Sequence, residues 1–190
     1  MMTQQTLERL HELRLPGMAA ALEEQMRMSD LGDLGFEDRL ALLLERELTV
    51  RDDRRLTRLL RLAKLSLQAA VEDINFRSPR GLDRSVILRL ASGQWIHEHD
   101  NVLISGATGT GKSYLACALG HSVCRQGLTV RYYRFSRLLG HLALARADGS
   151  YARLLDRLAK TQLLILDDFG LAPLTDPERR DLLEVLEDRY

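Results

Sequence analysis

The sequence predicts a mixed α/β protein, in which an all-helical N-terminal domain precedes a parallel sheet covered by helices. Residues 1–72 repeat apolar side chains at helical spacing and carry almost no strand signal. From residue 101 onward, short apolar strands alternate with helical stretches, a pattern typical of parallel pairing through crossover helices. We therefore expect a helical domain over 1–72, a connector over 73–100 and an α/β core over 101–190.

The N-terminal part is expected to contain helices near its start, over 18–28, and over 36–64. A loop is expected over 30–35, where glycines and aspartates gather. The last of these helices would be long for a globular protein, so a break near Thr49-Val50 is allowed for.

In the connector, Pro79 and Gly81 interrupt any helix, and Asp83 is expected to cap a short helix that follows. The core then reads as a regular series of elements. Its expected strands cover 102–105, 128–135 and 162–166, and its expected helices cover 112–126, 136–147, 151–160 and the residues from Pro177 onward.

A glycine-rich loop lies between the first expected strand and the helix that follows it. Residues 106–113 (GATGTGKS) match the pattern G-x-x-x-x-G-K-[ST]. Glycines let successive backbone N–H groups turn toward phosphate oxygens, and the start of the next helix adds its positive dipole end. In such a loop Lys112 reaches the terminal phosphates and the Ser113 hydroxyl binds Mg²⁺. The predicted contacts are Gly106, Ala107, Thr108, Gly109, Thr110, Gly111, Lys112, Ser113 and Tyr114.

This motif predicts binding of a nucleoside triphosphate, and the absence of an N-K-x-D guanine-reading motif favours ATP. A second element supports the prediction. The apolar run 163–166 ends in Asp167 and Asp168, at the carboxyl edge where α/β sheets bind ligands. We expect Asp167 to hold Mg²⁺ and Asp168 to polarise the attacking water, with Lys112 completing the catalytic set. The alternative for Asp168 is a turn cap before Phe169-Gly170.

A basic face is expected on the helix over 36–64. Its residues are Arg51, Arg54, Arg55, Arg58, Arg61 and Lys64, several of them at helical spacing. Such a face suits sequence-neutral contact with DNA phosphates, although it is equally typical of a solvated helix. The formal net charge is zero, so overall charge does not identify a partner.

Several classes of protein are disfavoured. No apolar run reaches the ~20 residues that span a bilayer, and the first residues lack a signal-peptide core, so a cytoplasmic protein without a membrane partner is expected. The histidines lack metal-ligand spacing. Cys117 and Cys124 are expected to be small buried residues of a reducing compartment.

The stretch GLDRSVILRLASGQWIHEHDNVLISGATGTGKSYLACALGHSVCRQGLTVRYYRFSRLL, with the later LLILDDFGLAPL, resembles the IstB-like ATPases. These are transposition helpers of bacterial insertion sequences and relatives of the replicative helicase loader. The resemblance is strong over about 75–175, and its specific parts are 94–96 (QWI) and 167–171 (DDFGL).

The resemblance implies an AAA+ type P-loop fold with a doubly wound parallel sheet. It also implies ATP-dependent self-assembly on double-stranded DNA and recruitment or stimulation of a transposase. Trp95 and Ile96 would lie against adenine, with a core anchor as the alternative for Trp95. The sensor residue and arginine finger of such a domain cannot be placed before Tyr190, so the C-terminal part is expected to be missing and hydrolysis by this chain stays open.

The motifs and the resemblance together predict three alternative functions. The first is a DNA-associated ATPase that assists transposition. The second is a helicase-loader-like ATPase that acts in replication, with a replicative helicase as its partner. The third is a nucleotide-gated assembly module that binds ATP without hydrolysing it.

Overall fold

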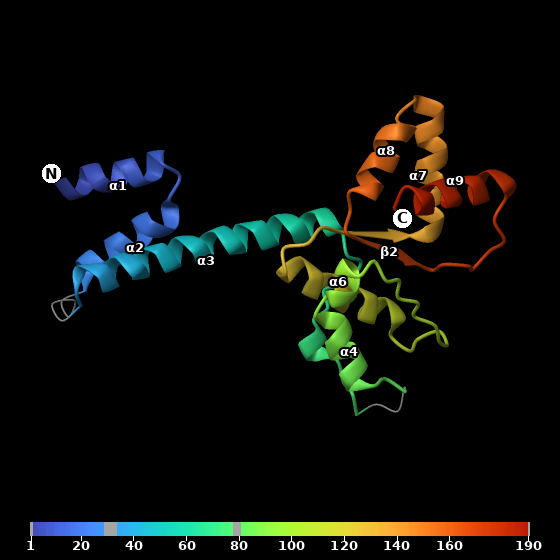
Figure 1. The fold of residues 1–190 in the computed structure, drawn as a ribbon, viewed down its shortest axis with the longest axis horizontal. Helices are drawn as coiled ribbons and strands as arrows, with labels where there is room; N and C mark the ends of the chain where they lie inside the picture. The colour runs from blue at the N-terminus through green and yellow to red at the C-terminus, as the bar shows by residue number, and fades with distance from the viewer. Residues whose placement is uncertain (1, 29–33, 78–80, 190) are drawn as a thin grey trace. The chain divides into compact units, whose positions relative to one another are not determined.

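The structure is a computed structural model that describes residues 2–28, 34–77 and 81–189 (Figure 1). It divides into two compact units, Met1–Thr57 and Arg58–Tyr190. The expected domain boundary at residue 72 lies inside the second unit, because residues 58–72 make their contacts there. Whether the helical part folds as a separate domain stays a prediction.

The first unit is helical, as expected. It contains α1 (Met2–Glu12), α2 (Pro16–Arg27) and most of α3 (Phe36–Ala63). Pro16 begins α2, where its fixed φ suits a first helical position. The predicted 30–35 loop lies mostly outside the described residues.

Helix α3 is continuous, so the break allowed for at Thr49-Val50 is absent. β-Branched residues disfavour a helix by restricting their side chains against the preceding turn. The Thr49 hydroxyl donates to the Glu45 carbonyl oxygen one turn earlier at 2.9 Å, so its polar group is satisfied within the helix.

Glu47 joins α3 to the start of α2. Its Oε2 accepts the backbone N–H groups of Gly17 at 2.7 Å and Met18 at 3.2 Å, and its Oε1 accepts from Arg51 Nε at 2.8 Å. The carboxylate therefore caps a helix N-terminus from a distant point in the chain. A side chain at position 17 would not fit, because a Cβ there would lie 2.6 Å from the Glu47 Cα. Burial alone would raise the pKa of Glu47, but these hydrogen bonds and the Arg51 charge hold the pKa below its ordinary 4.5.

We expect Glu47→Gln to destabilise the first unit by about 1–2 kcal/mol at neutral pH, because the buried helix N-terminus loses a charged acceptor. In the wild type this stabilisation is complete above about pH 4.5 and is lost as the pH falls through the lowered pKa. Helix content followed by circular dichroism during acid titration tests this. Glu45→Gln, an exposed glutamate on the same helix, is the control and should leave the acid transition unchanged. Superimposable transitions for the wild type and Glu47→Gln would contradict the assignment.

The second unit contains the predicted parallel sheet. Strand β1 (Val130–Arg134) pairs in parallel with β2 (Leu163–Asp167), and the register runs from Val130 opposite Leu163 to Arg134 opposite Asp167. The helices of this unit were expected, with small shifts at their ends, except the short helix over 94–97, where none was expected. They are α4 (Arg84–Ala91), α5 (Gln94–His97), α6 (Lys112–Arg125), α7 (Phe135–Asp148), α8 (Tyr151–Ala159) and α9 (Asp176–Glu187), with a short 3-10 turn η2 (Val71–Asp73) before them. Asp83 caps α4 as predicted, its Oδ1 accepting the Ser85 N–H at 2.7 Å.

Helices cover both faces of the sheet (Figure 1). Tyr132 and Ile165 pack with the buried residues of α4 and α6 on one face. Tyr133, Leu164 and Leu166 pack with α7, α8 and α9 on the other. The alternation follows from the two-residue period of a strand. Helix α6 lies close to the sheet at Gly120, where a Cβ would come within 2.8 Å of Ile165 Cδ1.

One expected strand is wrong. Residues 102–105 join no sheet, and Leu103 is 88% exposed. A strand needs a neighbour for its backbone hydrogen bonds, and β1 and β2 pair only with each other in the described ranges. The apolar pattern of this segment predicted burial correctly only for Ile104. Its side chain packs against the buried residues around α4 and α6, called the α4–α6 cluster below.

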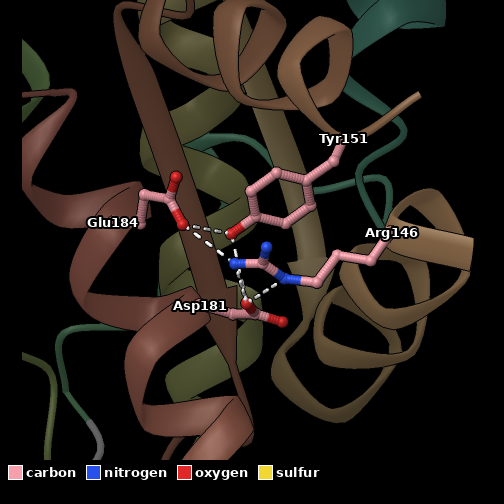
Figure 2. A network of polar contacts seen from close by, with 4 residues as sticks. All are labelled: Arg146, Tyr151, Asp181 and Glu184. Atoms are coloured by element: carbon pink, nitrogen blue, oxygen red, sulfur yellow. Dashed lines mark hydrogen bonds and ion pairs between the residues drawn. The ribbon is translucent and has the colours of Figure 1, made fainter. Parts of the chain in front are cut away.

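A polar network joins α9 to α7 and α8 (Figure 2). Arg146 donates to Asp181 Oδ1 at 2.7 Å and to Glu184 Oε2 at 3.0 Å, and its guanidinium lies 3.7 Å from the Tyr151 ring centroid. The Tyr151 hydroxyl donates to the same two carboxylates. Burial and these acceptors raise the pKa of Tyr151 well above its ordinary value. The network therefore ties together the three helices on one face of the sheet.

Candidate functional site

The glycine-rich loop has the backbone that its sequence predicts. Gly109 and Gly111 have φ of 82° and 92°, a region that residues with a Cβ rarely adopt. Gly111 is the N-cap of α6, so Lys112 is the first helical residue. The free N–H groups of a helix start therefore lie next to the loop, an arrangement suited to phosphate binding.

Lys112 lies across this loop. Its Nζ donates to the carbonyl oxygens of Gly106 and Ala107, each at 2.9 Å. The Thr110 hydroxyl also donates to the Ala107 carbonyl oxygen, at 2.8 Å. These contacts hold the positive charge at the loop, within reach of a phosphate that the loop would bind.

The two predicted motifs meet at Asp167, the last residue of β2. Its carboxylate accepts hydrogen bonds from the Tyr132 hydroxyl at 2.5 Å and from the Asp168 N–H at 3.0 Å, and the Ser113 hydroxyl lies near it. Burial would raise the pKa of Asp167, but these donors and the charge of Arg134 hold the pKa below its ordinary value, so the carboxylate is ionised at neutral pH.

The oxygens of Ser113 and Asp167 are the hard ligands that Mg²⁺ prefers. Mg²⁺ in triphosphate sites takes few protein ligands, and phosphate oxygens and water complete its shell. The arrangement fits this requirement, because the Ser113 hydroxyl lies near the Asp167 carboxylate. No cluster of three or more metal-ligating side chains occurs in the described part of the chain.

Asp168 follows in an unusual conformation, with φ of 58°. Its carboxylate is half exposed and lies 4.0 Å from Arg134 Nε. The next residue, Phe169, packs its ring against Phe135 with centroids 4.6 Å apart. The side chain of Asp168 thus faces a cation from the end of β1 at the carboxyl edge of the sheet. This position is compatible with the proposed catalytic role, and the role itself stays a prediction.

The residues expected near adenine are anchored to the protein. The Trp95 indole N–H donates to the Leu90 carbonyl oxygen at 2.8 Å, which ties α5 to α4. Trp95 and Ile96 are half-buried, and Tyr114 packs against the α4–α6 cluster. This geometry favours the anchor interpretation of Trp95, and the adenine contact stays a prediction.

The predicted DNA-contacting residues are all exposed, five of them on α3 and Lys64 directly after its end: Arg51, Arg54, Arg55, Arg58, Arg61 and Lys64. Arg51 is already held by Glu47. Exposure is compatible with phosphate contact and with a solvated helix alike.

Tyr132 and Arg134 are the site residues that sequence reasoning missed. Both lie on β1 and act on the two aspartates through the pairing with β2. The run of polar and aromatic residues in the expected 128–135 strand was the available signal. This run does not identify which aspartates the two residues contact, because the sequence of one strand does not determine its register against another.

A protein-family model described as IstB-like ATP binding protein matches residues 8–190. The chain belongs to this IstB-like family. Among its relatives, the insertion sequence IS1162 ATP-binding protein of Pseudomonas fluorescens is 54% identical over 190 residues, which cover this whole chain and 82% of the relative. An insertion sequence ATP-binding protein of Sinorhizobium fredii is 52% identical over the whole chain and 78% of its own length. One of Mycobacterium tuberculosis is 37% identical over 95% of this chain and 72% of its own.

The expected family is thereby confirmed, and with it a P-loop ATPase fold that contains a parallel sheet. ATP binding and an association with insertion sequences are properties of IstB-like proteins. Within the described ranges, no helix is long and apolar enough to cross a membrane.

Proposed function

We propose that this IstB-like protein is a Mg²⁺-dependent ATPase that assembles on double-stranded DNA and recruits or stimulates the transposase of an insertion sequence. The observation that carries the enzymatic part is that the Ser113 hydroxyl of the phosphate loop lies close enough to the Asp167 carboxylate to lower its pKa. The phosphate loop and the carboxyl end of β2 thus lie together, where Ser113 and Asp167 would hold the Mg²⁺ that accompanies a triphosphate.

Each residue has a distinct role in this proposal. Lys112 binds the terminal phosphates, and Ser113 with Asp167 holds the metal. When bound, Mg²⁺ neutralises charge on the phosphate oxygens. Asp168 orients and polarises the water that attacks the last phosphate.

The DNA part of the proposal rests on the exposed arginines of α3 and on the insertion-sequence relatives. ATP turnover of this chain, with and without double-stranded DNA at low and moderate salt, tests it. Stimulation that fades with added salt is expected, because counterions compete for the phosphate contacts. DNA that changes neither turnover nor self-association at low salt would contradict it.

We expect Asp168→Asn to lower kcat about 100-fold or more and to leave MgATP affinity unchanged, because a general base is lost while the phosphate and metal contacts remain. Asparagine tolerates the left-handed backbone of this position, so the fold should persist. Steady-state turnover and equilibrium binding of MgATP are the two measurements. Asp156→Asn, which removes an exposed carboxylate of α8, is the control.

The same variant separates the enzyme from the nucleotide-gated assembly module. If the protein is only an assembly module, Asp168→Asn changes no turnover because the wild type has none. ATP-dependent self-association would then be the activity that remains to be measured by light scattering.

A further inference from the structure

Tyr132 lies next to the candidate metal site and no predicted role accounts for it. Tyr132 is 8% exposed and lies on β1 opposite Ile165. Ile165 precedes Asp167 by two residues on β2. Side chains two residues apart on a strand point to the same face of the sheet. The phenol and the carboxylate therefore share the α6 face, and the Tyr132 hydroxyl reaches Asp167 Oδ2 at 2.5 Å.

An ionised carboxylate only accepts hydrogen bonds, so the Tyr132 hydroxyl is the donor in its contact with Asp167. The Ser66 side chain lies beside the Tyr132 hydroxyl, and Ser66 Oγ lies 3.5 Å from Cys117 Sγ.

Asp167 thus has donors on several sides. The Asp168 N–H comes from the turn after β2 and the Tyr132 hydroxyl from the neighbouring strand, while the Ser113 hydroxyl of the phosphate loop lies nearby. Ser113 and Asp167 are the residues that would hold Mg²⁺, each through an oxygen atom. Tyr132 supplies no metal ligand of its own in this arrangement. Its buried hydroxyl instead donates a hydrogen bond from β1 to the Asp167 carboxylate.

We propose that Tyr132 is a positioning residue of the magnesium site, whose hydroxyl orients the Asp167 carboxylate toward the metal. This inference rests on the proposed Mg²⁺-dependent ATP binding and extends it to β1. A hydrogen-bond donor that holds a metal-binding side chain in place strengthens metal binding, because the side chain loses less conformational freedom when the metal binds. Removal of such a donor typically lowers metal affinity 10- to 100-fold.

The test uses the full chain with Tyr132→Phe, which removes a single oxygen. A fluorescent ATP analogue is titrated in EDTA and then at increasing Mg²⁺ concentrations. Tyr132→Phe is expected to leave the affinity for the analogue in EDTA unchanged. It is expected to raise the Mg²⁺ concentration that gives half-maximal enhancement of analogue binding about 10-fold or more. Tyr133→Phe is the matched control on the adjacent position of β1, where the ring packs edge-on against His141 on the other face. It should leave the Mg²⁺ response at the wild-type value.

A purely structural role for the hydroxyl would appear differently. It would lower the melting temperature in EDTA and weaken binding equally with and without Mg²⁺, and that outcome would overturn the proposal. Ser66→Ala provides a second variant that leaves the Asp167 contact in place, and it should shift the Mg²⁺ response in the same direction by a smaller factor. A wild-type chain whose affinity ignores Mg²⁺ would overturn the proposed function and this inference with it. A normal wild-type response that Tyr132→Phe leaves unaltered would overturn this inference alone.

Discussion

Lys112→Ala is expected to abolish the rise in melting temperature that millimolar MgATP gives the wild-type protein. A ligand that binds the native state stabilises it according to its affinity, so the rise reports binding directly. Lys112 supplies the one cation that the loop sequence 106–113 contains, and its Nζ already lies at the loop carbonyls. A charged hydrogen bond to phosphate contributes roughly 1.5–3 kcal/mol, so its loss lowers affinity by about 10- to 100-fold or more where several phosphate oxygens are involved.

The substitution also removes two hydrogen bonds within the loop, so the melting temperature without nucleotide must be measured alongside. Only the difference between the two temperatures reports binding. Lys160→Ala is the matched control, because Lys160 is exposed and, in the described structure, its ammonium pairs only with Asp156 of the helix that it caps. A Lys112→Ala protein that keeps the full MgATP-induced rise would refute the phosphate role of this loop.

Asp181→Asn is expected to lower the stability of the second unit by about 2 kcal/mol, equivalent to a fall in melting temperature of roughly 4–8 °C for a chain of this size. The Asp181 side chain is only 7% exposed and accepts from both Arg146 and Tyr151 (Figure 2). Asparagine keeps the shape and an oxygen that can take the place of Oδ1, but it removes the negative charge that faces the Arg146 guanidinium in a buried place, so the hydrogen bonds to it lose their charge assistance.

Thermal unfolding without nucleotide measures the effect. Asp176→Asn is the control on the same helix, where the side chain is 78% exposed and its contact with Arg179 is 3.4 Å long. Exposed pairs of this kind contribute little, so the control should melt close to the wild type. Equal melting temperatures for Asp181→Asn and the wild type would show that the network does not hold α9 against α7 and α8.

Local patterns predicted most of the secondary structure of this protein. The loop at 106–113 was predictable in detail because its glycines, its lysine and the helix start act through backbone conformation, which neighbouring residues determine. Helix α4 was predictable for the same reason, since Asp83 caps it within two residues. The segment 102–105 shows the limit of this approach. Its apolar run indicates a strand, but a strand exists only where a neighbour accepts and donates its hydrogen bonds.

The sequence alone therefore establishes the family, the phosphate loop and the two aspartates that end an apolar strand. Whether these aspartates meet the loop depends on folding, which places Asp167 against Ser113. The same is true of Tyr132 beside Asp167, Arg134 near Asp168, and Glu47 at the start of α2. Each of these contacts joins residues far apart in the chain, so it depends on strand register and helix packing. Strand register and helix packing are determined by the burial of whole faces, so no short run of residues predicts them.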